Sequence, residues 1–507
     1  MFAAALLLAA SLSSIQPAAI KAHIDFLASD ALEGRETGTR GYDIASRYVA
    51  SQFALAGLEP RLQEVRLRTA IVEKGTFSVG DQAFVHRKDV IVGANFLKES
   101  SEVEGEVVFA GFGIVAPGLH PQDQGKVGVR RKSVMRPSGP PPQFPATQRA
   151  FYSDFDMKMK NASARGAVGV LTLRTLVDER RQPFEKSIKQ PPSTIMYAFE
   201  EELPTLRGRA IVSRDMANVL FAKAPIPLAQ VLADADKGVA HSFPLGVRAA
   251  IGTVTRLSET RSVNVYAVLP GASKPDEHVV LTAHLDHIGL VSEGEDRVRN
   301  GALDNASGIA ALLEIAKSIA AMPEKPARSI VFAALTAEEK GGGGSFQFAE
   351  HPPVPNIVAD VNMDMLTMLF PLKDVVALGS EHSSLGALAS AAATGAGFEV
   401  SPDPLPEEVR FIRSDQYAFV KKGIPAITYK GGLRSADPAI DGDKITRDWL
   451  SNVYHTVHDN PDQQIDYASG ARWADANRRL ILAIANAPER PRWNPGDFFG
   501  ETFGRAK

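Results

Sequence analysis

From Ser262 onward, short apolar stretches alternate with segments whose apolar residues recur every three or four positions. The apolar stretches include HVVLTA (278–283), SIVFAAL (329–335), IVADVNM (357–363) and GIPAITY (423–429), and the longest helical pattern is ARWADANRRLILAIANA (471–487). This alternation is typical of parallel strands connected by helices. We therefore predict a three-layer α/β/α domain with a mixed, largely parallel sheet over residues 255–507. Ligands of such sheets bind at the carboxyl ends of the strands.

The residues before this domain show different sequence patterns. Residues 20–65 predict two amphipathic helices around a Gly/Thr-rich loop, and we assign them to the same α/β domain. Residues 66–254 contain short β-like stretches separated by polar loops, including the proline-dense RPSGPPPQFPA. We expect a mainly β insert there, since 507 residues exceed what one hydrophobic core usually holds.

The first 19 residues combine a short apolar stretch with small residues, which predicts a signal peptide and an exported, periplasmic or extracellular protein. About ten apolar positions are too few to span a bilayer, and no later stretch approaches ~18 consecutive apolar residues. We therefore expect no transmembrane segment.

Charge and cysteine content narrow the function. The chain has 56 Lys and Arg residues and 59 Asp and Glu residues, which gives a net charge of −3. It therefore lacks the excess of basic residues that is typical of proteins that bind nucleic acid. The chain has no cysteine, so thiol catalysis, disulfides and thiolate metal sites are excluded. A transition metal would have to be held by His, Asp and Glu.

The stretch TAHLDHIG (282–289) places two histidines and an aspartate after a predicted strand. Because side chains alternate along extended chain, His284 and Asp286 can point together, whereas His287 is expected to point elsewhere. A histidine at a strand end is more often a hydrogen-bonded structural residue than a metal ligand. The ligand interpretation needs partners at other strand ends.

Such partners occur, although each has a structural alternative. Asp304 in NGALDNASG could simply cap a helix. The glutamates of TAEEKG could lie in a solvated turn, and His455 in VYHTVHD could lie in a surface loop. Asp364 in VNMDML lies within an apolar stretch, where a lone carboxylate is costly. Two zinc ions would balance the charges of Asp304, Glu339, Asp364 and one hydroxide, with neutral His284 and His455 completing the set.

These five motifs, in this order, resemble the metal-site motifs of the M28 family of zinc peptidases, which includes aminopeptidases, glutamate carboxypeptidases and glutaminyl cyclases. The N-terminal DALEGRETGTRGYDIASRYVASQF also fits this family, and the insert is similar to a protease-associated domain. Two departures are the four glycines 341–344 and the charged GKVGVRRKSVM (125–135), which replace more apolar segments.

The resemblance implies a role for each matching residue. His284 and Asp364 would complete one zinc site and Glu339 and His455 the other, with Asp304 bridging the two ions. Glu338 would be the general base, and Asp286 would steady His284. A cis peptide bond between Asp304 and Asn305 is implied as well.

The expected function is therefore a zinc-dependent aminopeptidase that uses two Zn²⁺ per chain to hydrolyse the N-terminal peptide bond of peptides. A glutamate carboxypeptidase would need clustered arginines, and only Arg410 and Arg413 lie near one loop. A glutaminyl cyclase usually uses one zinc and lacks the insert. A non-catalytic receptor or binding protein on this scaffold would have lost ligands.

Two further expectations concern residues outside the ligand set. The segment RSDQYAFVKKGIPAI resembles the family's substrate side, where Arg413, Ser414, Asp415 and Tyr429 could either shape the pocket or cap helices and pack in the core. The insert's histidines, His86, His120 and His241, are expected to bind no metal. The sequence does not indicate an oligomeric state.

Overall fold

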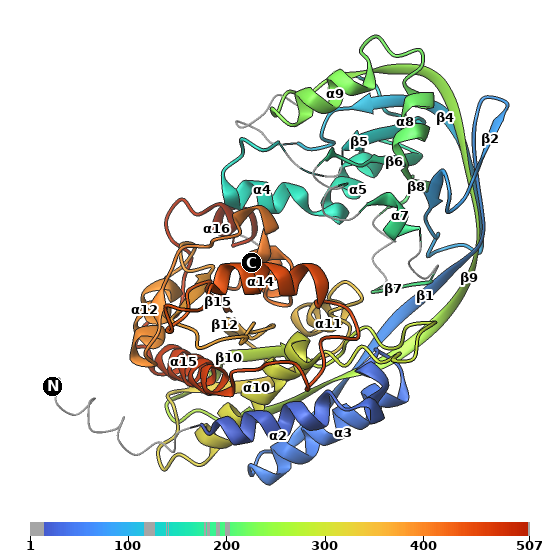
Figure 1. Ribbon diagram of the computed structural model, residues 1–507. Coiled ribbons are helices and arrows are strands. Elements are labelled where there is room, and N and C mark those ends of the chain that lie inside the picture. Colours follow the sequence, from blue (N-terminus) through green and yellow to red (C-terminus); the bar gives the residue numbers. More distant parts are fainter. Residues whose placement is uncertain are drawn as a thin grey trace. The chain divides into compact units, whose positions relative to one another are not determined.

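The computed structural model describes residues 15–115, 127–137, 139, 141–176, 179, 183–188, 193–197 and 203–504. The chain divides into two compact units (Figure 1): unit 1 comprises Met1–Val65 and Arg261–Lys507, and unit 2 comprises Arg66–Thr260. Most of the predicted signal peptide, and His120, lie outside the described residues. None of the described helices is both long and apolar enough to cross a membrane.

Unit 1 is built on a mixed, largely parallel sheet, which confirms the predicted fold class. Its strand order is β14 (Glu399–Val400), β13 (Asp374–Leu378), β15 (Ala426–Gly431), β12 (Ile357–Asn362), β10 (Lys274–His284), β11 (Arg328–Leu335) and the end of β9 (Ser242–Leu269). β10 runs parallel to both of its neighbours, β11 and β12, while β9 and β13 pair antiparallel to the sheet. The three central parallel strands, β10, β11 and β12, position the residues of the candidate site.

Helices cover both faces of this sheet, because the central strands are apolar on both sides. Along β10, Val279 and Leu281 pack in a core with α2 (Pro17–Leu27), α3 (Arg40–Leu55), α10 (Ser307–Ala320) and α15 (Tyr467–Asn486). Val280, between them, packs on the opposite face with Phe348 of α11 (Gly343–Glu350) and Phe419 of α13 (Gln416–Lys421). This alternation produces the three layers.

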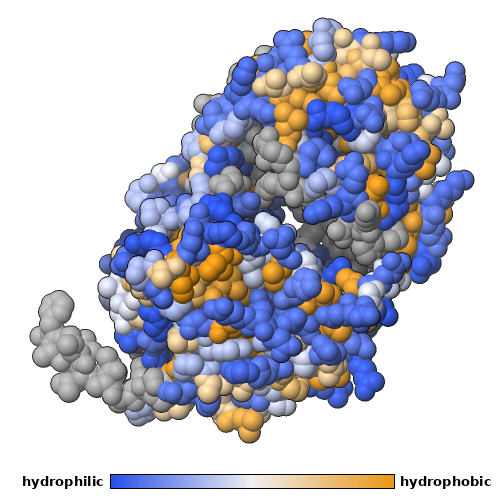
Figure 2. All heavy atoms as spheres, viewed as in Figure 1, coloured by the Kyte–Doolittle hydropathy of each residue, from blue (hydrophilic) through white to orange (hydrophobic). Residues whose placement is uncertain are grey.

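The remaining helices of unit 1 lie in its C-terminal half. They are α12 (Leu385–Gly395), α14 (Gly442–Asn452) and α16 (Phe498–Phe503), and short 3₁₀ turns lie at Asp30–Arg35, Pro406–Glu408 and Arg410–Ile412. In the view of Figure 2, hydrophilic and hydrophobic residues are interspersed over the surfaces of both units. The large apolar residues of the central strands are instead buried in the cores.

Unit 2 contains helices as well as the strands expected for the insert. Its strands are β1 (Pro60–Val79), β2 (Gln82–Val85), β3 (Val90–Val92), β4 (Ser100–Ala110), β5 (Ser133–Pro137), β6 (Gly169–Leu173), β7 (Ser193–Tyr197), β8 (Gly208–Val212) and most of β9. Its helices are α4 (Ala146–Ser153), α5 (Phe155–Ala164), α7 (Phe184–Ser187), α8 (Arg214–Leu220) and α9 (Leu228–Ala235). These helices are only one to three turns long, so their periodicity was too short to stand out in the sequence.

Candidate metal centre

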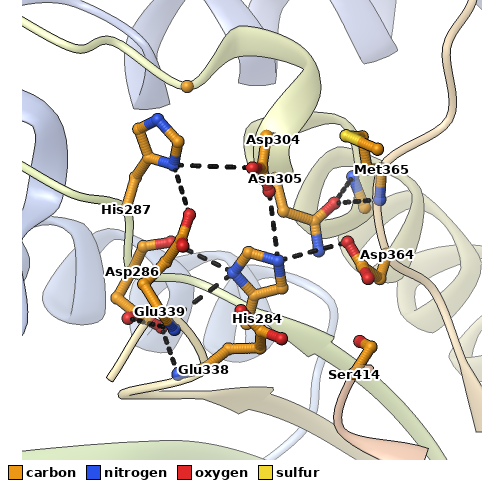
Figure 3. Close-up of polar contacts among 12 residues, drawn as sticks. His284, Asp286, His287, Asp304, Asn305, Glu338, Glu339, Asp364, Met365 and Ser414 are labelled. Carbon is orange, nitrogen blue, oxygen red and sulfur yellow. Dashed lines mark hydrogen bonds and ion pairs between the residues drawn. The ribbon is translucent and has the colours of Figure 1, made fainter. Parts of the chain in front are cut away.

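The predicted ligands lie together at one edge of the sheet. His284 is the last residue of β10, the two glutamates of TAEEKG follow β11, and Asp364 follows β12. Since these three strands are parallel neighbours, their carboxyl ends meet at the same edge. Asp304 lies just before α10, and His455 lies in the loop between α14 and α15. Figure 3 shows most of these side chains converging.

One group of donors forms around His284. Its Nε2 atom lies 3.3 Å from Oδ1 of Asp304 and 3.3 Å from Oδ1 of Asp364. All three side chains are buried. The ligand atoms of this group lie close enough together to hold one metal ion.

A second group of donors forms around Glu339. Nε2 of His455 lies 3.2 Å from Oδ2 of Asp304 and 3.3 Å from Oε2 of Glu339. The His455 ring stacks on Tyr454, with ring centroids 3.8 Å apart. Asp304 thus presents one oxygen to each group, which is the arrangement expected of a bridging ligand.

His287 joins the second group, which the sequence did not predict. Its Nδ1 atom lies 2.8 Å from Oε1 of Glu339 and 3.8 Å from Oδ2 of Asp304 (Figure 3). The expectation that it points elsewhere is wrong because β10 ends at His284, so strand alternation does not extend to His287. Its backbone instead pairs with the N-terminal segment, donating to the carbonyl oxygen of Arg35 at 3.2 Å. His458, by contrast, is exposed.

The spacing of these atoms fits a zinc ion. Two ligand atoms about 2.0 to 2.1 Å from a tetrahedral zinc stand about 3.3 to 3.4 Å apart. The four contacts of His284 and His455 with the carboxylates measure 3.2 to 3.3 Å. A donor set of imidazole nitrogens and carboxylate oxygens also suits zinc, with manganese or cobalt as substitutes.

The charges of the site also favour cations. Although burial opposes it, contact with Asp304 and Glu339 raises the pKa of His455 to about 10. Burial raises the pKa of Glu338 well above its ordinary value, against the opposing charge of His284 and with further contributions from Glu339 and Asp364. Without a metal, His455 therefore holds a proton between Asp304 and Glu339, and a divalent cation bound there would replace that proton.

Asp286 holds the turn that carries the two glutamates. Its carboxylate accepts hydrogen bonds from the backbone N–H of Glu338 at 3.1 Å and of Glu339 at 3.3 Å, and from the hydroxyl of Thr37 at 3.0 Å. The resemblance implied that Asp286 steadies His284. That contact is made by the carbonyl oxygen of Asp286, 3.1 Å from Nδ1 of His284, whereas the carboxylate is 4.0 Å away.

Three buried residues that the sequence analysis did not single out support the site. Asp459 accepts the backbone N–H groups of Leu303 at 3.0 Å and Asp304 at 3.1 Å. Lys430, a charged residue at the end of an apolar strand, lies with Nζ 2.9 Å from Oδ2 of Asp364. Asp459 stands in the quoted motif VYHTVHD, but its spacing gave no sign of its partners.

The third residue, Arg35, is a buried guanidinium that binds main-chain carbonyl groups. It donates to the carbonyl oxygens of Leu285 at 3.0 Å, Asn300 at 2.7 Å and Gly301 at 3.1 Å, and also to that of Leu27. These carbonyls flank the segments that carry the metal-site residues. The peptide bond between Asp304 and Asn305 is cis, as the resemblance implied.

The four residues expected to shape a pocket differ in their surroundings. Ser414 accepts a hydrogen bond from Asn362 at 2.9 Å, and burial raises the pKa of Asp415 to about 7. Tyr429 is fully buried in the core and donates to the carbonyl oxygen of Ala389, so it does not line an open pocket. Arg413 is half exposed and pairs with Glu408 at 2.9 Å.

The chain is similar to known peptidases. Residues 264–481 match the model of peptidase family M28. A segment of 113 residues is 35% identical to Aminopeptidase NAALADL1 of Rattus norvegicus, covering 22% of this chain and 14% of that protein. Another match, to the Glutamate carboxypeptidase 2 homolog of Caenorhabditis briggsae, is 24% identical over 295 residues and covers 57% of this chain and 32% of that protein. The chain thus spans less than a third of the length of these two relatives.

A solved structure has the same fold. The aminopeptidase from Aneurinibacillus sp. strain AM-1 aligns with a TM-score of 0.57 and 18% sequence identity, and the alignment covers 95% of each chain. At this level of identity the similarity establishes the fold.

The position of Asp304 depends on Asp459, which gives a first prediction. In Asp459→Asn, an NH₂ group replaces one carboxylate oxygen and cannot accept a hydrogen bond. The backbone N–H of either Leu303 or Asp304 therefore loses its partner. We expect zinc affinity to fall about 10- to 100-fold, as is usual when a partner behind a ligand is lost. Competition with a chromogenic chelator measures this, with Asp462→Asn, at an exposed position nearby, as the control. Equal zinc affinity in both variants would contradict this role.

Proposed function

We propose that this protein, whose residues 264–481 match the model of peptidase family M28, is a zinc-dependent aminopeptidase that hydrolyses the N-terminal peptide bond of peptides. The observation that carries the proposal is the pair of donor groups that share Asp304, with a fourth carboxylate, Glu338, beside them. The apolar and small residues 1–19 lead us to propose, in addition, that the protein is exported.

In this proposal each group of donors holds one zinc ion. His284 and Asp364 would hold the first ion and Glu339 and His455 the second, with Asp304 shared between them. Bound zinc supplies Lewis acidity, which lowers the pKa of water toward neutrality and polarises a carbonyl group.

The proton is moved by Glu338. Its backbone N–H is fixed by Asp286, so the adjacent Glu339 can bind a metal while the Glu338 carboxylate remains available. Glu338 accepts a proton from the attacking water and returns it to the leaving amine.

The surroundings of the two arginines support an aminopeptidase over a carboxypeptidase. Arg410 pairs with Asp403 and Arg413 with Glu408, so both guanidinium groups near this loop already have acidic partners. The presence of two donor groups supports a two-metal peptidase over a glutaminyl cyclase. A non-catalytic binding protein has no need of Glu338 beside a complete set of ligands.

Substrate scope tests the activity directly. We expect aminoacyl-p-nitroanilides to be cleaved and their N-acetylated forms to be left intact, because the free amine is part of what is recognised. Absorbance of released nitroaniline measures this over a panel of amino acids. Release of C-terminal glutamate from N-blocked peptides, or cyclisation of N-terminal glutamine, would instead favour the corresponding alternative.

Metal removal tests the cofactor. Dialysed protein is expected to retain two zinc ions per chain, and a chelator should abolish activity until zinc is restored. Elemental analysis gives the stoichiometry. His241→Ala is the control, since this histidine pairs with Asp234 in unit 2 and should be replaceable without loss of zinc. Full activity with a single ion would refute the two-metal proposal.

The neighbouring glutamates should respond differently to the same change. Glu338→Gln keeps its shape but cannot accept a proton, so both ions should remain while turnover falls about 10²- to 10⁴-fold. Glu339→Gln should lose one zinc, because a neutral amide is a poor ligand. Zinc content and turnover are measured on the same samples. If the metal is lost from Glu338→Gln and kept in Glu339→Gln, the two roles are exchanged.

A further inference from the structure

The two oxygens of Glu339 face different nitrogen atoms. Oε2 lies 3.3 Å from Nε2 of His455, and Oε1 lies 2.8 Å from Nδ1 of His287. Figure 3 shows the His287 ring directed at Glu339 and Asp304. His287 is fully buried, so this contact is shielded from water.

The distances to the carboxylates differ between His455, a proposed metal ligand, and His287. Ligands of one tetrahedral zinc stand about 3.3 to 3.4 Å apart. His455 meets this spacing with both carboxylates, at 3.2 and 3.3 Å. His287 departs from this spacing, at 2.8 Å from Glu339 and 3.8 Å from Asp304, although its Nδ1 belongs with these two carboxylates to a group of donor atoms close enough together to hold an ion. A separation of 2.8 Å is instead that of an N–H···O hydrogen bond.

The His287 ring is held in place by the backbone around it. The N–H of His287 donates to the carbonyl oxygen of Arg35 at 3.2 Å. On one side the ring packs on Gly301, where an added Cβ atom would approach two ring carbons to 2.7 Å. A ring that is anchored through its backbone and packed on one side can direct Nδ1 at one oxygen and keep it there.

We propose that His287 is a positioning residue, which donates its Nδ1–H to Oε1 of Glu339 and leaves Oε2 alone to bind the second metal ion. This inference rests on the proposed function. It assigns the proton to Nδ1, so Nε2 carries none and has no hydrogen-bond partner among the described residues. His287 therefore shapes the site without being a ligand.

Asp364, which like Glu339 belongs to only one of the two donor groups, also has its two oxygens facing different partners. Oδ1 of Asp364 lies 3.3 Å from Nε2 of His284, and Oδ2 lies 2.9 Å from Nζ of Lys430, which is also buried. Glu339 and Asp364 thus each have one oxygen beside a proposed ligand histidine and the other beside a buried nitrogen donor. One-oxygen binding at both ions keeps their coordination numbers low and leaves positions for water and substrate.

Cobalt substitution tests the role of His287, because the visible absorption of Co²⁺ weakens as its coordination number rises. In His287→Ala, Oε1 is released and Glu339 can bind through both oxygens. We expect the visible band of the second ion to weaken and its dissociation constant to rise about 10- to 100-fold. In His287→Asn, the amide Nδ2 replaces the N–H donor at the same place, and both properties should return to near wild-type values.

His458→Ala is the matched control, since this exposed histidine follows His455 at the same offset as His287 follows His284. It should leave the spectrum unchanged. A wild-type spectrum in His287→Ala would overturn the inference, as would loss of the second ion from both His287 variants, which would make His287 a ligand. Wild-type protein that binds fewer than two Co²⁺ would instead refute the proposed function itself.

Discussion

Crowding of buried carboxylates at one sheet edge is the constraint on which this structure depends. Asp304, Glu338, Glu339 and Asp364 all stand within one small, largely buried region. Two like charges about 4 Å apart repel by ~1 kcal/mol in water and by ~4 kcal/mol at the effective dielectric constant near a protein surface. The fold keeps these groups together with bound protons and positive partners, among them imidazoles, the Lys430 ammonium and the buried Arg35 guanidinium.

Main-chain hydrogen bonds hold the crowded side chains in place. Asp286 and Asp459 each accept two backbone N–H groups, one pair in the glutamate turn and the other beside Asp304. Arg35 does the reverse, donating to carbonyl groups on either side of the ligand segments. Because these contacts fix the backbone, the ligand geometry does not depend on long, flexible side chains. This explains why an N-terminal segment distant in sequence belongs to unit 1.

The sequence predicted those features that follow from strand order. The central sheet and the positions of His284, Glu339 and Asp364 follow from the rule that parallel strands end at a common edge, and the assignment of individual roles came from the family resemblance. The orientation of His287 could not be predicted, because it depends on a turn after the strand and on contact with Arg35. Lys430 was missed since its partner is brought near only by neighbouring strands. For Tyr429 the sequence left pocket lining and core packing open, and its hydroxyl faces the core.

The discontinuous construction of unit 1 has a consequence for its synthesis on the ribosome. Arg35 precedes its partner Leu285 by 250 residues. At about 5 to 20 residues per second, roughly 10 to 50 s separate the translation of these two positions. During this interval the apolar faces of α2 and α3 have no core to join, so they are exposed to chaperones and to other nascent chains. The metal centre can assemble only later still, because Asp364 and His455 are translated after β10 and β11.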